Sequence, residues 1–153
     1  MRKVLRKKEI KSLAEYLNET VLTDKARVEL VKDQKDEFIF IKKPLLFKFN
    51  EGWIYTLHSI LEKFNVKKYP KIKVDKGAIK FIANGADIMR PGIIEIDSNV
   101  EKDKVVLIIE ETYNKPLAIG IALFDYSDMN EKETGKVIKT IHFVGDDIWN
   151  KEI

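Results

Sequence analysis

The feature that most limits the fold of this chain is a run of five consecutive branched apolar residues, Val105 to Ile109. An uninterrupted apolar run suits a strand that is buried on both faces, because a half-exposed strand would alternate apolar and polar side chains. Glu110 and Glu111 are expected to end the run at the surface. The second half of the chain is therefore expected to contain a sheet with this strand in its interior.

The residues around this run predict several more short strands and a single helix. Ile72 and Val74 indicate a brief strand, after which Asp75 is placed to cap a helix that continues through Ala83. Further strand candidates are Pro91–Asp97, Lys104–Glu110, Pro116–Asp125 and Lys136–Phe143, with loops at Asn99, Asn114–Lys115 and Ser127–Gly135. Many short strands around one helix favour a pseudo-β-barrel.

The first half of the chain predicts a small α/β domain. Apolar residues in the segment 8–18 recur with helical spacing, and short strand patterns follow at Val28–Val31, Glu37–Ile41 and Pro44–Phe49. A second helix is predicted from Trp53 to about Asn65. His58 is expected on its polar side as a surface residue.

The best candidate for a domain boundary lies just before Pro70, because proline biases the preceding residue away from helix. We expect domains at 1–70 and 71–153. The connector is short, so a fixed orientation is predicted, with the N-terminal domain packed on the C-terminal one. The fold class is α+β.

Charge is divided unevenly between these halves. There are 16 basic and 10 acidic side chains through Pro70, and 12 basic and 15 acidic ones from Lys71 onward. A cluster near the N-terminus is a candidate for phosphate contact, since neutralised phosphates release counterions. The alternative is an ordinary solvated surface. The cluster contains Arg2, Lys3, Arg6, Lys7, Lys8 and Lys11.

Several classes of function receive no support from the sequence. There is no cysteine, so disulfides, thiolate nucleophiles and cysteine zinc sites are excluded, and a reducing cytoplasm is the expected location. Two histidines are too few for a metal site, and phosphate-loop, dinucleotide and nucleophile-elbow motifs are missing. No apolar stretch reaches the length of a membrane span. We expect no catalysis, cofactor, metal or membrane insertion.

The segment from Lys76 to Ile93 carries the main functional signal. Gly85 and Gly92 allow close backbone approach by a ligand, Arg90 offers a forked cation between them, and Lys76 and Lys80 lie one helical turn apart. Such a backbone-lined concavity suits a phosphate or a nucleotide end. The alternative is a helix end, a loop and a strand start that need glycine only for geometry.

The same segment resembles the helix, loop and second strand of a PUA domain, and Pro116–Ala122 and Ile141–Trp149 extend the match. Val74–Phe81 and Gly85–Gly92 are more closely similar to the malignant T-cell-amplified sequence (MCT) family of translation factors and their archaeal relatives. Pro44–Phe49 resembles that family's N-terminal, pre-PUA domain more weakly.

The resemblance implies a non-enzymatic RNA-binding protein of translation, acting in initiation, on the ribosome or with tRNA. It places RNA between the first PUA helix, the glycine loop and the second and last strands. The candidate RNA ligands are Lys76, Lys80, Gly85, Ala86, Arg90, Pro91, Gly92 and, in the last strand, His142. For His142 the alternative is ordinary packing within its strand. Animal relatives carry cysteine at the position of Arg90, which puts an identical ligand in doubt.

The implied partners are a tRNA acceptor end or ribosomal RNA, the small ribosomal subunit and a partner like density-regulated protein. Two alternatives stay open. One is a protein-interaction adaptor whose acidic C-terminal half never touches RNA. The other is an accessory protein that presents tRNA to a separate modifying enzyme.

Overall fold

The structure is a computed structural model that describes residues 1–17, 27–62 and 69–152. The chain forms two compact units. The N-terminal unit contains Met1–Val66 together with Asp147–Ile153, and the C-terminal unit contains Lys67–Asp146. The chain thus passes between the units twice, whereas the sequence predicted a single crossing after Pro70 and assigned the last residues to the second domain.

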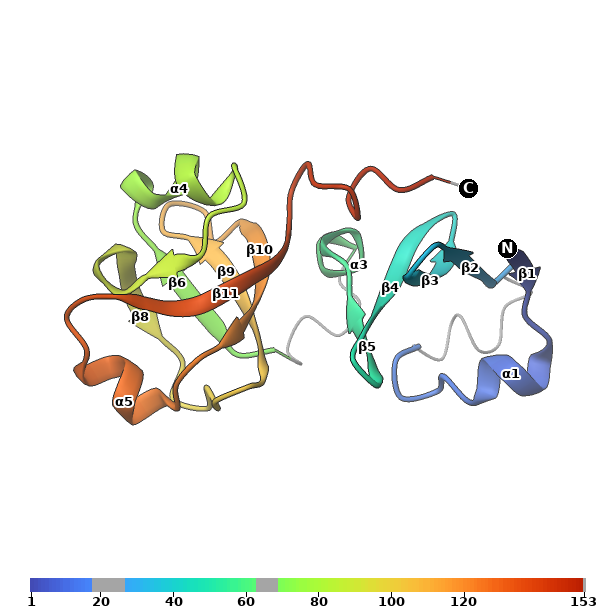
Figure 1. The fold of residues 1–153 in the computed structure, drawn as a ribbon, viewed down its shortest axis with the longest axis horizontal. Helices are drawn as coiled ribbons and strands as arrows, with labels where there is room; N and C mark the ends of the chain where they lie inside the picture. Colours follow the sequence, from blue (N-terminus) through green and yellow to red (C-terminus); the bar gives the residue numbers. More distant parts are fainter. Residues whose placement is uncertain (18–26, 63–68, 153) are drawn as a thin grey trace. The chain divides into compact units, whose positions relative to one another are not determined.

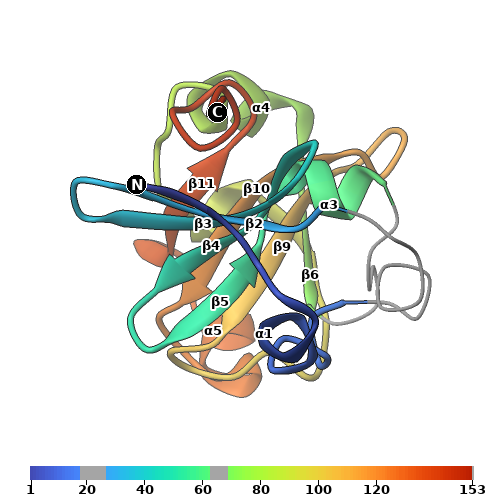
Figure 2. The same cartoon turned by 90° about the vertical axis from the view of Figure 1, so that its right-hand side faces the viewer.

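The N-terminal unit contains an antiparallel sheet in the order β1-β2-β3-β4-β5 (Figures 1 and 2). The strand register places Ile39, Leu46 and Tyr55 on one face and Phe38, Phe47 and Ile54 on the other, and all six side chains are buried. The elements described are β1 Arg2–Val4, α1 Lys7–Lys11, β2 Glu29–Asp33, β3 Asp36–Ile41, β4 Lys43–Phe49, β5 Gly52–Tyr55 and α3 Leu57–Leu61.

Two sequence-based expectations for this unit are corrected by the structure. The second helix does not begin at Trp53, because Gly52–Tyr55 pairs with β4 after a turn in which Asn50 has a φ of 54°. Thr56 then caps α3 by accepting a hydrogen bond from the Ser59 amide at 3.2 Å. The first helix is also shorter than the segment 8–18: α1 ends at Lys11, turns follow, and residue 18 lies outside the described residues.

The C-terminal unit contains a six-stranded sheet in the order β7-β11-β10-β9-β6-β8, curled into a nearly closed barrel (Figure 1). The apolar run of β9 lies between β10 and β6, as its pattern predicted, and pairs with β6 in parallel. The pseudo-β-barrel is therefore confirmed. The elements described are β6 Lys71–Val74, α4 Lys76–Ile82, β7 Ile88–Met89, the 3₁₀ turn η1 Arg90–Gly92, β8 Ile93–Ile96, β9 Val105–Glu110, β10 Pro116–Ala122, α5 Tyr126–Glu131 and β11 Lys136–Phe143.

The helix α5 lies where the sequence predicted a loop. Its Met129 side chain has no exposed surface and belongs to the same apolar core as Val106, Ala122 and Ile138. Burial of one large side chain stabilises a short helix that local propensity alone would not support. The loop predicted at Ser127–Gly135 is therefore wrong for the residues up to Glu131 and correct for the four that follow.

Candidate nucleic-acid interface

The helix α4 begins and ends with well-defined caps, which fix its position beside β7 and η1. The Asp75 carboxylate accepts a hydrogen bond from the Ala78 amide at 3.0 Å. At the other end the Ala86 amide donates to the Phe81 carbonyl and the Gly85 amide donates to the Ile82 carbonyl, which is the paired pattern of a Schellman motif. The predicted Asp75 cap is therefore present.

Gly85 is required at the end of α4 for two independent reasons. Its φ is +85°, a conformation that residues with a Cβ rarely adopt, and a Cβ built there would lie 2.8 Å from Cε1 of Phe143. The following loop is tied to β11, because the Thr140 hydroxyl donates to the Ala86 carbonyl and the Thr140 amide donates to the Asp87 carboxylate, both at 2.9 Å. The loop is thus fixed by the end of α4 and by hydrogen bonds to β11.

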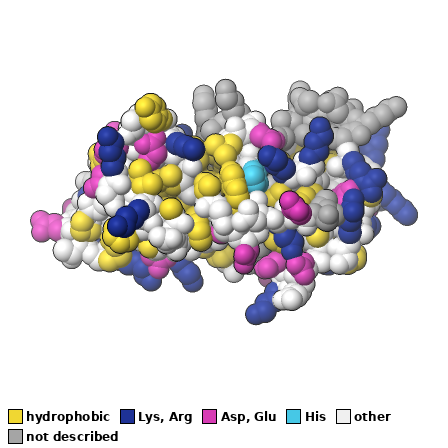
Figure 3. Space-filling view, turned by 90° about the horizontal axis from the view of Figure 1, so that it is seen from above, with side chains coloured by type: hydrophobic (Ala, Val, Ile, Leu, Met, Phe, Trp, Pro, Cys, Tyr) yellow, Lys and Arg dark blue, Asp and Glu magenta, His cyan; other side chains and the backbone are white. Residues whose placement is uncertain are grey.

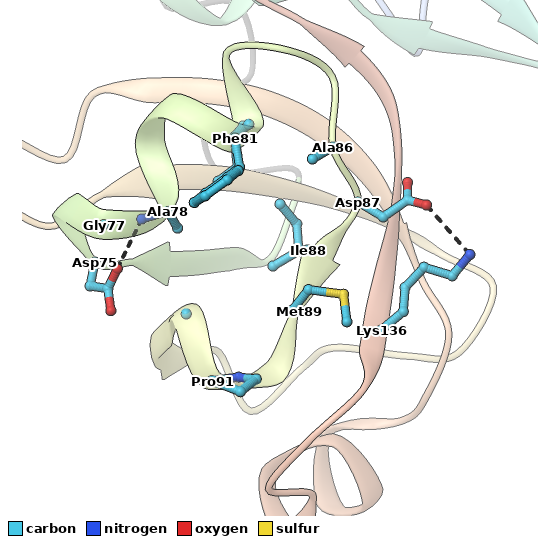
Figure 4. A pocket seen from close by; sticks show the side chains of 12 residues that line it. Asp75, Gly77, Ala78, Phe81, Ala86, Asp87, Ile88, Met89, Pro91 and Lys136 are labelled. Carbon is cyan, nitrogen blue, oxygen red and sulfur yellow. Dashed lines mark hydrogen bonds and ion pairs between the residues drawn. The ribbon is translucent and has the colours of Figure 1, made fainter.

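Helix α4, the loop after it, β7, η1 and the start of β11 line an open groove of about 770 Å³, which we call the α4 groove (Figure 4). Figure 4 shows Phe81, Ile88 and Met89 directed toward it from α4 and β7. Phe81 is 60% exposed and Met89 is 50% exposed, which is unusual for such large apolar side chains. The groove is lined by Asp75, Gly77, Ala78, Phe81, Ile82, Ala86, Asp87, Ile88, Met89, Pro91, Gly92 and Lys136.

Lysines surround this apolar surface. Lys136 lines the groove and pairs with Asp87 at 3.4 Å. The ammonium of Lys80 lies 5.7 Å from the centre of the Phe81 ring, and both Lys76 and Lys80 are exposed on α4. An exposed aromatic face with cations beside it suits a nucleobase that stacks while its phosphates meet the lysines.

Three of the predicted ligands, Ala86, Pro91 and Gly92, line the α4 groove. Gly92 lets η1 approach α4, since a Cβ there would lie 3.3 Å from the Cβ of Ala78. Gly85 is next to the groove in the loop. As RNA contacts, these residues and the two lysines of α4 stay predictions.

Arg90 has a different arrangement from the free forked cation that its sequence position suggested. Its Nε donates to the Met129 carbonyl at 2.9 Å, while its terminal nitrogens donate to the carbonyls of Ile93 at 3.3 Å and Asn130 at 3.4 Å. Arg90 is not among the residues that line the groove. The guanidinium therefore joins η1 and β8 to the last turn of α5, where helix carbonyls lack partners within the helix.

His142 is fully buried, so the side chain offers no surface to an RNA in this structure. Its Nδ1 lies 2.9 Å from the Asp146 carboxylate, which also accepts a hydrogen bond from the Phe143 amide. This pair closes the turn after β11. A direct contact between His142 and RNA is incompatible with this burial.

The residues that sequence reasoning missed are Phe81, Met89 and Lys136. Phe81 had a recognisable signal, because single-strand binding sites combine basic side chains with aromatic ones on which bases stack, and Phe81 follows Lys80. Lys136 is brought to the groove only because β11 pairs with β7, through Lys136 and Met89. Local spacing does not contain that pairing.

The basic N-terminal cluster is partly neutralised by ion pairs. The guanidinium of Arg2 donates to the buried carboxylate of Glu29 at 2.5 Å, and Arg27 pairs with the same carboxylate. These hydrogen bonds, first from Arg2 and then from Arg27, lower the pKa of Glu29 from 4.5 to about 2. Lys3 pairs with Glu9 at 2.8 Å. The remaining members of the cluster, Arg6, Lys7, Lys8 and Lys11, are exposed on and beside α1.

Other features of the described residues bear on the excluded functions. Glu110 is buried, so the expectation that it lies at the surface was wrong. Its carboxylate accepts hydrogen bonds from the amides of Thr112, Tyr113 and Lys115, which lower its pKa, with the Lys115 amide contributing most. It organises a turn. Among residues 1–17, 27–62 and 69–152, no three metal-ligating side chains meet, and no helix is long and apolar enough to cross a membrane.

The class of protein follows from the fold together with two family matches. Residues 70–144 match the PUA domain, and residues 1–63 match a domain of unknown function, DUF1947, which corresponds to the predicted pre-PUA domain. A hypothetical protein from Pyrococcus horikoshii OT3 has a similar structure, with a TM-score of 0.77, 32% identity and 98% of both chains covered. The chain is thus a PUA-domain protein with a DUF1947 domain before it.

Relatives narrow this class to one family. Translation machinery-associated protein 20 of Saccharomyces cerevisiae is 32% identical over 85% of this chain and 75% of its own length. Malignant T-cell-amplified sequence 1 of Danio rerio is 30% identical over 91% of this chain and 78% of its own length. The chain belongs to the family of these two proteins, which confirms the resemblance seen in Val74–Phe81 and Gly85–Gly92.

Proposed function

We propose that this chain is a non-enzymatic RNA-binding protein of the translation machinery that acts in the cytoplasm and binds an unpaired RNA end in the α4 groove. The PUA match and the names of the relatives support the general role. The observation that carries the finer proposal is the exposed Phe81 ring beside Lys80, in a groove that Lys136 also lines. An unpaired base stacks on such a ring, and this mode suits single strands, ends and loops.

The RNA that fits this description best is a tRNA acceptor end, with an exposed segment of small-subunit ribosomal RNA as the second candidate. Both present unstacked bases next to a phosphate backbone. The groove is mostly apolar and its one lining cation, Lys136, is already paired with Asp87. Selectivity for an end is therefore expected to come from stacking more than from charge. A small ribosomal subunit and a partner like density-regulated protein are the proposed setting.

The test compares a short RNA stem that has a free CCA end with the same stem lacking it. Fluorescence anisotropy is measured for the wild type, Phe81→Ser and a control, Tyr113→Ser. Tyr113 is an 85% exposed aromatic residue on the β9–β10 turn of the same unit and does not line the groove. Loss of one stacked base costs about 1–3 kcal/mol, so Phe81→Ser is expected to weaken binding of the CCA stem by about fivefold or more.

Each result has a distinct meaning. Weaker binding of the CCA stem by Phe81→Ser alone supports an acceptor end in the groove. Equal binding of both stems by all three proteins contradicts the groove as the site of end recognition. Absence of RNA binding by the wild type contradicts the proposed function and favours a protein-interaction adaptor.

A further inference from the structure

The last residues of the chain help to form a second hollow, of about 540 Å³, within the N-terminal unit. Three separate segments contribute to it: the turn between β3 and β4, the start of α3 and residues 149–152, which we call the C-terminal segment. We call it the tail hollow. The charged and aromatic side chains that line it are Lys42, Lys43, His58, Trp149, Lys151 and Glu152.

One wall of the tail hollow is a fixed pair of rings. His58 and Trp149 stack with ring centres 3.8 Å apart and planes inclined by 20°. Nε2 of His58 lies 2.9 Å from the Trp149 carbonyl, so this nitrogen is the donor and carries the proton. His58 is thus a contact of the C-terminal segment, and the expectation that it is a simple surface residue was wrong.

The C-terminal segment is also held by Lys151. Its ammonium pairs with the Asp33 carboxylate and lies 5.4 Å from the centre of the Phe38 ring. The wall and this anchor give the hollow a defined shape in the absence of any ligand. A site whose walls are already placed loses little conformational entropy on binding.

The other side of the tail hollow is formed by two consecutive exposed lysines. Lys42 and Lys43 make no ion pair within the described part of the chain, where most other basic residues of β1 to β4 do. Lys42 has a φ of 68°, a conformation for which glycine or asparagine is better suited. The only acidic side chain among the lining residues is Glu152, against three lysines.

We propose that the tail hollow binds a backbone phosphate of the RNA whose end lies in the α4 groove. A polar hollow with an excess of lysines attracts a phosphate oxygen, because each ammonium is a compact point charge and neutralising a phosphate releases its counterions. This inference rests on the proposed function, because it assigns a second contact to the same RNA. It also explains why the N-terminal half is basic although the end-binding groove lies in the C-terminal unit.

The experiment measures affinity for the CCA stem over a series of KCl concentrations. The test variant is Lys42→Ser/Lys43→Ser. The control, Lys102→Ser/Lys104→Ser, removes two exposed lysines from the loop before β9, which line neither hollow. Each phosphate contact in a single strand contributes about 0.7 to the slope of log affinity against log salt, so the test variant is expected to lose about 0.7 from that slope. The control is expected to keep it.

A second measurement reports on the hollow itself. In a Trp53→Phe background, Trp149 is the only tryptophan of the chain, so its fluorescence follows the stacked wall. Titration with the CCA stem is expected to change this fluorescence, and Lys42→Ser/Lys43→Ser is expected to remove the change. The salt slope of Phe81→Ser tests the groove separately, because that variant keeps both lysines.

The outcomes separate the two proposals. A slope that falls equally in test and control variants means that the lysines act only through net charge, and it overturns the tail hollow while leaving the groove intact. An unchanged slope in the test variant overturns it as well. A fluorescence change produced equally by inorganic phosphate at matched ionic strength, with no further effect of RNA, assigns the hollow to a small phosphorylated compound and contradicts the RNA assignment.

Discussion

Replacement of Gly85 by alanine should destabilise the C-terminal unit and deform the α4 groove. The residue has a φ of +85°, and the new methyl group would lie 2.8 Å from Cε1 and 3.0 Å from Cζ of Phe143. Real Cβ atoms do not approach other atoms this closely, so either the Phe143 ring or the loop has to move. The same loop carries Ala86, which lines the groove.

The magnitude can be worked out by comparison with Gly135→Ala. Gly135 has a φ of +89°, but a Cβ there would meet nothing within 4 Å. In both variants, holding alanine in the left-handed conformation costs about 1–2 kcal/mol of unfolding free energy. Alanine also restricts the unfolded chain more than glycine does, which offsets about 0.4–1 kcal/mol of this cost. Only Gly85→Ala adds the overpacking of a filled site, about 1–3 kcal/mol. Its loss of unfolding free energy is expected to exceed that of the control by this amount.

Amide hydrogen exchange is the suitable assay. Both tryptophans, Trp53 and Trp149, lie in the N-terminal unit, so tryptophan fluorescence would not report on the barrel. Exchange of buried amides in β9 and β10 measures the opening of the C-terminal unit directly. Equal losses in the two variants would refute the contact with Phe143, and no loss in either would refute the left-handed geometry. Phe143→Leu in the Gly85→Ala background should restore part of the difference, as a double-mutant cycle would show.

Three further perturbations test the interactions described above. Arg90→Met removes three hydrogen bonds to backbone carbonyls and should cost the C-terminal unit about 1–3 kcal/mol by hydrogen exchange while the salt slope of RNA binding stays the same, and a lower slope would make Arg90 a phosphate ligand. Glu29 has a folded pKa lowered from 4.5 to about 2, so its stabilising effect is present above pH 4.5 and lost toward pH 2. Urea unfolding over this range should show a smaller pH dependence for Glu29→Gln, and an equal one would contradict the assignment. Removal of residues 147–153 eliminates the Trp149 ring on His58 and should lower the urea midpoint of the N-terminal unit, whereas an unchanged midpoint would show that the segment is not a structural part of that unit.

Much of the barrel could be predicted because its signals are local. The Asp75 cap, the left-handed Gly85 and the apolar run of β9 each require only neighbouring residues to be recognised. The elements that were missed depend on distant partners. β5 forms because Gly52–Tyr55 pairs with β4, and α5 forms because Met129 enters the core. Neither pairing nor burial is contained in local spacing.

The residues of the candidate site also differ in how well the sequence predicted them. Glycine positions fixed the place of the groove, and Pro91 and Gly92 line it as residues next to a close backbone approach should. Charge was a poorer guide, because a cation in the sequence carries no information about its partners. Arg90 donates to three carbonyls and His142 is buried against Asp146, so both polar residues act within the fold.

The α4 groove and the tail hollow are expected to contribute different properties to RNA binding. The α4 groove is apolar and its lining lysine is paired, so it should discriminate between RNA ends while adding little salt dependence. Net positive charge lies in the first 70 residues, which hold 16 basic and 10 acidic side chains, and Figure 3 shows basic side chains over the N-terminal unit. Most counterion release should therefore arise there. End selectivity and salt dependence should therefore be separable by mutation. A Phe81→Ser variant that loses selectivity but keeps its salt slope, with the reverse for Lys42→Ser/Lys43→Ser, is the pattern that this arrangement requires.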